Sequence, residues 1–396
     1  MTYASITDRL AGLGSGKWAV HFRARQLQAE GRRIIELTIG EPDIPPSAEL
    51  LDVCAAAMRA GRTRYSNGRG EARLLEAIAA KYSRRTGRTI GTDQVLCFPG
   101  TQTALYTVMT GLVEAGDAVL IPDPYYATYE GVVRATGAAV VPVPTSDRHR
   151  FHLQADDLAA AVTPQAKVLL LNTPHNPTGA VLNATEIAAI GAVCQRHDLW
   201  IVCDEVYEEL ILEGSFASPF DSADLAGRTI VVSSISKSHA APGFRSGWAV
   251  GPAEFCARLL PVSEIMLFGG QPFIADMTAH ALTHDIPTAA AMREAYRRRA
   301  ALVCAALAEC PGLRPLPPEA GMFLLIDVRA TGLSGDAFAH GLLEAAEVAV
   351  MPGSSFGTGA EGFIRLSLTV PDATLEEALH RIARFAAAQG RKAVAE

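Results

Sequence analysis

Between residues 94 and 251, short runs of apolar residues recur and predict strands that are buried on both faces. The seven runs are residues 94–98, 117–121, 138–143, 167–172, 199–204, 229–234 and 247–251. Segments with helical apolar spacing follow several of them, as at 103–116 and 184–198. Apolar runs that alternate with helices are typical of a mostly parallel sheet covered on both faces. The pattern therefore predicts an α/β fold with a seven-stranded sheet.

From about residue 290 onward the pattern changes to α+β. A long amphipathic helix is predicted at 291–310, and shorter helices and strands follow it. The strands are expected at 321–328, 348–353 and 363–370, and the helices at 335–346 and 373–390. Residues 1–47 are too few for a domain of their own and are expected to pack on this region. We expect a large domain at 48–289 and a small domain formed by 1–47 and 290–396.

Composition excludes some classes of function. The 396-residue chain is 49% hydrophobic and 19% charged, an ordinary globular balance. Its formal net charge is -7, without a block of Lys and Arg, which argues against binding nucleic acid or an anionic membrane. The seven cysteines form no CxxC pair, so neither a disulfide framework nor a metal site is indicated. Without a signal-like start or a run near ~18 apolar residues, a cytoplasmic protein is expected.

Ligands of such sheets bind outside the carboxyl ends of the strands, so the residues after each run are candidates. Lys237 follows the run 229–234, where an amine can form a Schiff base with a carbonyl cofactor. Asp204 ends the run 199–204, and Tyr207 comes one helical turn later, so both can face one cleft. Asn176 lies in a rigid loop, TPHNPTG, after the run 167–172. Each residue also has a plain alternative as a surface, turn or capping residue.

Two more strand ends complete the pattern. Gly100, Thr101 and Gln102 open a helix after the first run, and a helix N-terminus is a ready anion site. Tyr126 lies in the tyrosine-rich stretch PYYATY, where core packing is the usual fate of such rings. Together the strand ends offer an amine, a carboxylate, hydrogen-bond donors, an aromatic face and a phosphate cradle. Pyridoxal phosphate needs this whole set.

Motifs spread over nearly the whole chain resemble the fold type I pyridoxal-phosphate aminotransferases of class I/II. The resemblance is carried by IGEPD at 39–43, YSNGRG at 65–70, PGTQ at 99–102, PYYATY at 124–129, NTPHNPTG at 172–179, DEVY at 204–207, SISKSHAAPGFRSGW at 234–248 and FIRLSL at 363–368. It implies a large domain with a mostly parallel seven-stranded sheet, a smaller α+β domain, and pyridoxal 5'-phosphate as cofactor.

The resemblance also implies roles around the cofactor ring. Lys237 would form the Schiff base and later move the proton of the substrate's α-carbon. Asp204 would pair with the ring nitrogen, and Tyr126 would stack on the ring. Asn176 and Tyr207 would hydrogen-bond the phenolate oxygen of the ring.

Further residues are implied for the phosphate, the neighbouring subunit and the substrate. The phosphate group falls to Gly100, Thr101, Gln102, Ser234 and Arg245. Tyr65 would reach the phosphate of the neighbouring subunit, which implies a homodimer with shared active sites. Arg365 would bind the α-carboxylate as a planar fork, close to Gly40, Tyr126 and Asn176.

The implied reaction is transfer of an amino group between an amino acid and a 2-oxo acid, and the donor stays open. Thr101 stands where similar aspartate aminotransferases carry a lysine that reaches the distal carboxylate, which weakens an aspartate assignment. TPHNPTG, HDLW at 197–200, SISKSHAAPGFRSGW and REAYRRR at 293–299 resemble bacterial arginine–pyruvate transaminases. They indicate a basic or broad-range donor with pyruvate as acceptor. Trp18, His21 and Arg23 could line the entrance or only pack.

Three alternatives remain. An aspartate aminotransferase carries the same cofactor motifs, and so does a β-eliminating C–S lyase on the same fold. A non-enzymatic sensor that joins this fold to a DNA-binding module is disfavoured, because the chain shows no basic N-terminal extension.

Overall fold

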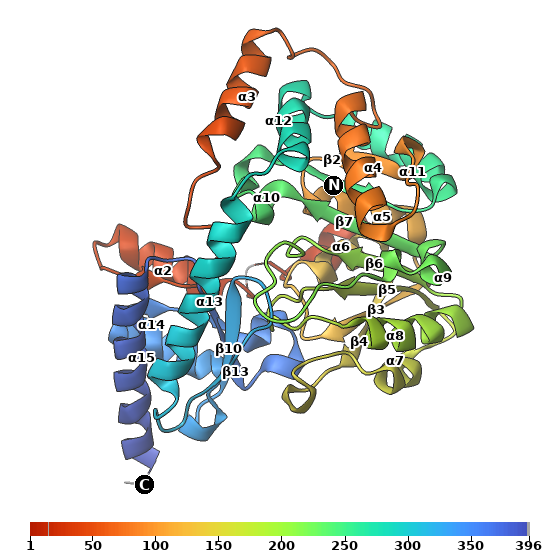
Figure 1. The fold of residues 1–396 in the computed structure, drawn as a ribbon. Coiled ribbons are helices and arrows are strands. Elements are labelled where there is room, and N and C mark those ends of the chain that lie inside the picture. Colours follow the sequence, from red (N-terminus) through yellow and green to blue (C-terminus); the bar gives the residue numbers. More distant parts are fainter. Residues whose placement is uncertain (15, 394–396) are drawn as a thin grey trace.

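A computed structural model describes residues 1–14 and 16–393, which form a large α/β part beside a smaller α+β part (Figure 1). The strands are β1 (Ile35–Glu36), β2 (Val95–Phe98), β3 (Ala118–Asp123), β4 (Ala139–Pro144), β5 (Ala166–Asn172), β6 (Trp200–Asp204), β7 (Thr229–Ser234), β8 (Gly247–Val250), β9 (Arg314–Leu316), β10 (Phe323–Asp327), β11 (Val348–Ala349), β12 (Met351–Pro352) and β13 (Phe363–Ser367).

Helices surround these strands and connect most of them. They are α1 (Ser5–Leu10), α2 (Ala19–Ala29), α3 (Ala48–Arg59), α4 (Ala72–Thr86), α5 (Thr101–Leu112), α6 (Tyr129–Thr136), α7 (Ala155–Ala161), α8 (Ala184–Arg196), α9 (Ala223–Ala226), α10 (Ile235–Ser238), α11 (Ala253–Leu267), α12 (Pro272–Thr283), α13 (Thr288–Leu307), α14 (Gly335–Ala346) and α15 (Asp372–Ala393). The long helix α13 runs from the large part to the small one (Figure 1).

The large part is built on a sheet with strand order β2-β8-β7-β6-β5-β3-β4. Only β8 is antiparallel to its neighbours, β2 and β7, and the other pairs are parallel. All seven predicted strands are present, so the prediction of a mostly parallel seven-stranded sheet is confirmed. The antiparallel direction of β8 is a detail that its apolar run did not indicate.

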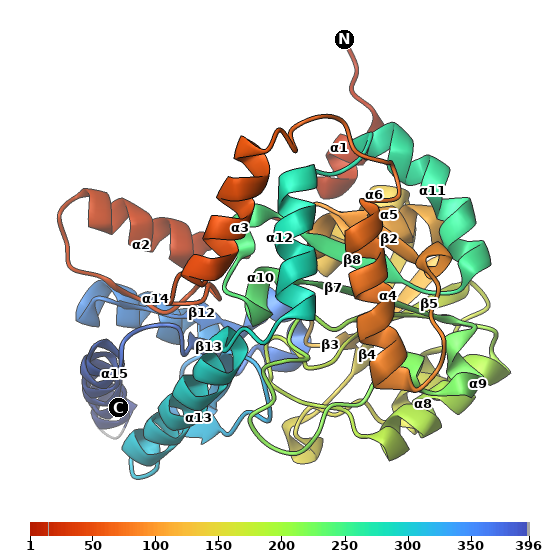
Figure 2. The ribbon, with the colours of Figure 1, turned by 45° about the horizontal axis from the view of Figure 1, so that its top comes forward.

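Both faces of this sheet are buried, which explains the continuous apolar runs. Along β6, Val202 packs in one core with α5 and α11, whereas Ile201 and Cys203 pack in another core with α8. A further core joins β7 and β8 to α4 and α12. Helices α3, α12 and α4 lie side by side over this region (Figure 2). Helix layers therefore leave the strand ends as the open edge of the sheet.

The small part contains an antiparallel sheet, β12-β13-β10-β9, and a parallel pair, β1 with β11. Helices α2, α13, α14 and α15 share one apolar core with these strands. The single strand predicted at 348–353 is divided into β11 and β12, which belong to different sheets. Strands β1 and β9 are too short to show a periodicity, and the sequence did not predict them.

The first 47 residues divide between the two parts. Val20, Ala24 and Leu27 of α2 lie in the core of the small part, as expected. Helix α1 instead lies against α6, where the Arg9 guanidinium donates to the carbonyl oxygens of Arg134 (2.9 Å) and Ala135 (3.1 Å). The expectation that 1–47 packs on the small part thus holds for α2 and is wrong for α1. The domain boundaries at 47/48 and 289/290 stay predictions.

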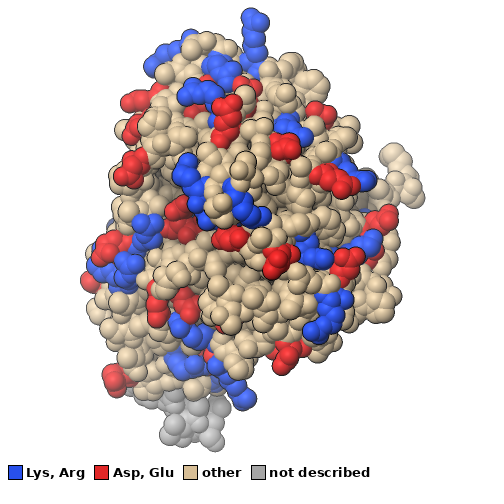
Figure 3. All heavy atoms as spheres, turned by 45° about the vertical axis from the view of Figure 1, so that its right-hand side comes forward, with Lys and Arg blue, Asp and Glu red and all other residues tan. Residues whose placement is uncertain are grey.

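Charged side chains of both signs are interspersed over the face in Figure 3, without a broad patch of one sign. Across residues 1–14 and 16–393, no helix combines the length and the apolar character that a membrane crossing requires.

Candidate active site

A cavity of about 490 Å³ opens where the carboxyl ends of β5, β6 and β7 meet the N-terminus of α5 and the edge of the small part. It gathers eleven of the thirteen residues that the sequence predicted for the site. They are Gly40, Thr101, Gln102, Tyr126, Asn176, Asp204, Tyr207, Ser234, Lys237, Arg245 and Arg365. These residues come from seven separate stretches of the chain, and the fold brings them together because parallel strands end at the same edge.

Lys237 lies on α10, a single helical turn that directly follows β7. Ser234 caps this turn, since its side-chain oxygen accepts a hydrogen bond from the Ser236 N–H at 3.3 Å. The Lys237 Nζ donates to the carbonyl oxygen of Gly40 across the cavity. Burial lowers the pKa of the Lys237 amine to about 8. The amine therefore loses its proton more readily than a surface lysine, as a nucleophile or a proton acceptor requires.

Asp204 ends β6 and is only 4% exposed. Its carboxylate accepts hydrogen bonds from the Tyr129 hydroxyl at 2.8 Å and from the Val206 N–H at 3.2 Å. Burial nevertheless raises the pKa of the Asp204 carboxyl to about 6. No described cation forms an ion pair with it, so the site favours a cationic ligand atom beside this carboxylate.

The pH dependence of stability should reveal this buried carboxyl in the cofactor-free protein. The folded-state pKa of Asp204 is about 6 and its ordinary value is 3.8, so between these pH values the folded state binds more protons than the unfolded state. Its contribution to the free energy of unfolding should therefore fall by roughly 2–3 kcal/mol as the pH rises from 4 to 6. Urea unfolding of the wild type and of Asp204→Asn across this window should show a difference that changes by that amount. Parallel profiles for the two proteins would refute the buried, unpaired state of Asp204.

Arg365 lies on β13 and is 1% exposed. Its Nη1 donates to Asn176 Oδ1 at 2.9 Å and its Nη2 to the Thr38 carbonyl oxygen at 2.5 Å, whereas its buried Nε has no partner. The guanidinium carbon lies 3.9 Å from the centre of the Phe323 ring. Burial lowers the pKa of Arg365 to about 10, which still leaves it charged at neutral pH.

No carboxylate among the described residues forms an ion pair with Arg365. A buried cation without an anion is costly, and a free N–H in the cavity can donate to a ligand. Asn176, which accepts from Arg365, also places its Nδ2 3.5 Å from the Tyr207 hydroxyl. These contacts make the end of the cavity near Arg365 suitable for a carboxylate.

An anion site lies at the start of α5. Gly100 caps this helix with a φ of 86°, which favours glycine, and a Cβ there would collide with the guanidinium of Arg245. The buried Thr101 Oγ1 has no hydrogen-bond partner. Free helix N–H groups, an unsatisfied hydroxyl and an adjacent arginine together suit a phosphate group.

These features fit the pyridoxal phosphate that the sequence resemblance implies. Thr101 Oγ1 is an orphan donor at the phosphate end, and Gly100 keeps the space that Arg245 fills. Asp204 is a buried carboxyl that a cationic ring nitrogen would complement. Lys237 is a buried amine with a lowered pKa. Each of these residues is unsatisfied, or shifted in its pKa, in the sense that this cofactor would compensate.

Some residues of the cavity were missed from the sequence. Tyr129, Asn172, Trp18, Glu41 and Phe323 all line it. Asn172 Nδ2 donates to the Asp204 carbonyl oxygen at 2.9 Å, and its Oδ1 accepts from the Asn176 N–H at 2.8 Å. Asn172 ends β5, so the rule that selected Asp204 at the end of β6 could have found it.

Two predicted residues lie outside the cavity lining. Gly100 is adjacent to it through Arg245. Tyr65 is 88% exposed and packs edge-on against Phe268, with ring centres 5.0 Å apart. A single chain does not bring Tyr65 to the cavity, and its role in a neighbouring subunit stays a prediction.

The possible entrance residues separate in the structure. Trp18 lines the cavity, whereas His21 pairs with Glu36 at 2.7 Å and Arg23 with Glu344 at 2.7 Å. His21 and Arg23 therefore act in packing.

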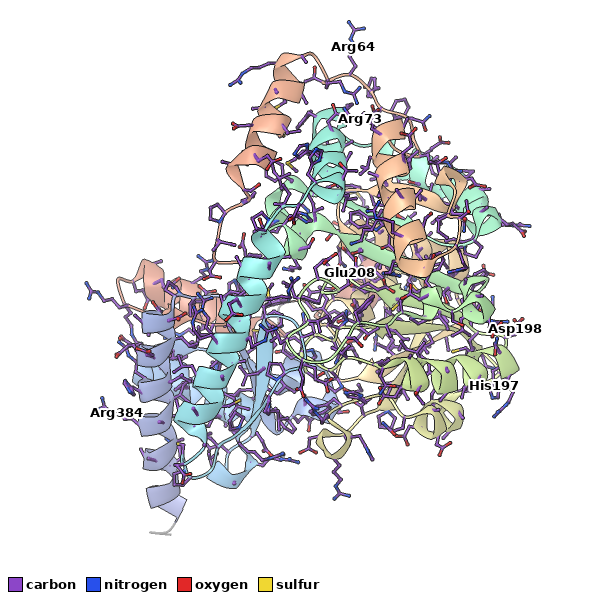
Figure 4. All side chains as sticks on the ribbon, in the orientation of Figure 1. Arg64, Arg73, His197, Asp198, Glu208 and Arg384 are labelled. Atoms are coloured by element: carbon purple, nitrogen blue, oxygen red, sulfur yellow. The ribbon has the colours of Figure 1, made fainter. Side chains whose placement is uncertain are left out.

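Stretches that carry the resemblance do not all reach the cavity. In HDLW, the Asp198 side chain is 98% exposed, and Figure 4 places His197 and Asp198 at the outer edge of the molecule. In REAYRRR, Arg299 is buried and pairs with Asp43 at 2.9 Å and with Asp372 at 2.8 Å. These two stretches support the fold and do not by themselves select a substrate.

Comparison with known proteins gives a consistent picture. The family model described as aminotransferase class I and II matches residues 32–382. An arginine–pyruvate transaminase of Pseudomonas aeruginosa is 44% identical over 98% of both chains. An aspartate aminotransferase of Geobacillus stearothermophilus is 32% identical over 96% of this chain and 98% of its own. The crystal structure of the Rhizobium meliloti aspartate aminotransferase superposes with a TM-score of 0.93 at 29% identity, covering 98% of this chain and 99% of that one.

Proposed function

The chain belongs to the class I and II aminotransferases, and from this premise we propose that it transfers amino groups from a basic or broad-range amino acid to pyruvate. Enzymes of this family use pyridoxal phosphate and convert an amino acid and a 2-oxo acid into their counterparts. The donor and acceptor are the proposed part. The observation that carries them is the full-length identity of 44% to an arginine–pyruvate transaminase, against 32% for the aspartate enzyme of Geobacillus stearothermophilus.

The proposal assigns the cofactor's contacts to residues of this chain. When bound, pyridoxal phosphate supplies an aldehyde that reacts with amines and a ring that accepts electrons from the substrate's α-carbon. Asp204 would face its ring nitrogen, and Tyr126 would cover one face of its ring. Thr101, Gln102, Ser234 and Arg245 would hold its phosphate, beside Gly100. Asn176 and Tyr207 would donate to its ring oxygen.

Lys237 and Arg365 would act on the substrate. Lys237, whose pKa is about 8, would accept the α-proton at its Nζ and return it at the end of the reaction. Arg365 would orient the substrate through its α-carboxylate, with Gly40 close by. The hydrogen bond between Asn176 and Arg365 would hold the guanidinium in position for both substrates.

The proposal includes a homodimer in the cytoplasm. Tyr65 and Phe268 form an exposed aromatic pair, and Ile265 nearby in the chain is also exposed. Exposed apolar side chains of this kind support an interface, in which Tyr65 would reach the partner's phosphate site. All seven cysteines are free, which supports a reducing compartment.

A panel of amino donors tests the proposed substrates. With pyruvate as acceptor, arginine should give a kcat/KM at least about tenfold above that of aspartate, because the cavity has Thr101 where a lysine would bind a distal carboxylate. The panel should include arginine, lysine, alanine and aspartate, each with pyruvate and 2-oxoglutarate. A preference for aspartate would overturn the donor assignment. Release of pyruvate and thiol from cystathionine without any oxo acid would indicate the C–S lyase instead.

A further inference from the structure

The cavity contains one carboxylate that the reaction leaves unused. Its lining holds two acidic residues, Asp204 and Glu41. Asp204 is buried behind the proposed cofactor position, whereas Glu41 is exposed beside Gly40. Within the described part of the chain, no hydrogen bond or ion pair engages the Glu41 carboxylate. It is therefore free to bind a ligand.

The electrostatics of the cavity place Glu41 close to the reacting amine. Of the charges that act on the pKa of Lys237, that of Glu41 has the largest effect, ahead of Arg365 and Arg245, and it raises the pKa. Coulomb interactions fall with distance, so this carboxylate faces the same space as the Lys237 Nζ. The other charges of the cavity already have partners in the proposed function.

The backbone that carries Glu41 is held on both sides. The carbonyl oxygen of Gly40 accepts a hydrogen bond from Lys237, and Asp43 pairs with Arg299 at 2.9 Å. Arg299 is itself fixed, because its guanidinium also donates to the Leu368 carbonyl oxygen at 2.9 Å and to Asp372 at 2.8 Å. Two anchors within four residues preorganise the position of Glu41.

We propose that Glu41 determines donor specificity by binding the cationic side chain of a basic amino acid. The inference rests on the proposed function, in which Arg365 binds the α-carboxylate and Lys237 acts at the α-carbon. A donor that satisfies Arg365 and Glu41 together must carry a carboxylate at one end and a cation at the other. An acidic side chain would meet Glu41 as a like charge and be rejected.

Replacing Glu41 by glutamine tests this role, because the variant keeps the shape and removes the charge. With pyruvate as acceptor, kcat/KM for arginine should fall by about 10- to 100-fold, as expected for the loss of a charge-assisted hydrogen bond. With alanine as donor, kcat/KM should stay within about threefold, since alanine has no cation to lose. An equal loss for both donors would overturn the proposal.

Asp43→Asn is the matched control on the same segment. Asp43 holds the backbone through Arg299 and does not line the cavity. Its variant should lower kcat/KM for arginine and alanine by the same factor, because a displaced segment disturbs every donor. If Asp43→Asn instead shows the arginine-selective loss of Glu41→Gln, selectivity belongs to the segment's position, and the proposal for the Glu41 charge fails.

A binding measurement separates this inference from the proposed function. δ-Guanidinovalerate has the carboxylate and guanidinium of arginine but no α-amine, so it binds without reacting. By calorimetry, the wild-type holoenzyme should bind it at least about tenfold more tightly than heptanoate, and Glu41→Gln should lose that preference. A preference that survives in Glu41→Gln would overturn the role of Glu41. Failure of the wild type to use arginine, with the guanidinium preference intact, would contradict only the proposed reaction.

Discussion

Replacing Lys237 by alanine should lower the rate of transamination by at least about 10⁴-fold while leaving the fold intact. Lys237 is the one lysine in the cavity lining, and its amine would serve both as attachment point of the cofactor and as proton acceptor. General acid–base catalysis alone is worth about 10²–10⁴-fold, and loss of covalent attachment adds to that. Single-turnover kinetics of the purified variant, mixed with pyridoxal phosphate and donor, would measure the loss.

Lys167→Ala provides the matched control for this variant. Lys167 is half-exposed at the start of β5 and pairs with Asp117 at 2.9 Å, away from the cavity. Its removal should change kcat by less than about twofold, because isolated surface ion pairs contribute little. Near-normal turnover of Lys237→Ala would show that another group moves the proton, and would refute the assignment of Lys237.

Arg365→Ala should lower kcat/KM by about 10²- to 10³-fold for the amino donor and for the oxo acid alike. Both substrates carry a carboxylate, and removing one partner of a buried, hydrogen-bonded charge pair typically costs 2–5 kcal/mol. Binding of the cofactor should stay close to normal, because Arg365 lies at the opposite end from the Thr101 and Arg245 anion site. Steady-state kinetics with each substrate varied, together with a cofactor titration, would measure both effects.

Arg365→Lys tests the geometry of the guanidinium with the charge retained. A lysine cannot reproduce the planar fork that donates to Asn176, so roughly a tenfold loss should remain. Arg365 also packs against Phe323, and thermal unfolding must show that both variants are folded. If either folded variant retained a wild-type KM for both substrates, the carboxylate site would have to lie elsewhere.

The sequence predicted the large sheet well because burial on both faces leaves a signal that depends only on local residues. The run at 199–204 had to be apolar throughout, since Val202 and Cys203 face different helix layers. The direction of β8 could not be predicted, because the same apolar run suits a parallel or an antiparallel strand. The division of 348–353 into two sheets depends on pairing with β1 and β13, which are distant in sequence.

The same distinction holds for the site. Residues such as Lys237 and Asp204 directly follow strands, so the topology of a parallel sheet was enough to bring them together. Glu41 and Phe323 come from the small part, and their position depends on how that part packs over the strand ends. Tyr129 was predicted only as a packing tyrosine, whereas its hydroxyl donates to Asp204. Contacts between the two parts of the molecule are therefore what the sequence did not indicate.

Borohydride reduction of the purified protein, followed by peptide mapping, tests most directly whether this cavity holds pyridoxal phosphate on Lys237. The protein should be yellow before reduction, and mass spectrometry should find the reduced cofactor on the peptide that contains Lys237 and on no other. Lys237→Ala should carry no covalent adduct. A colourless protein that takes up no pyridoxal phosphate, or an adduct on a different lysine, would contradict the assignment of the cavity.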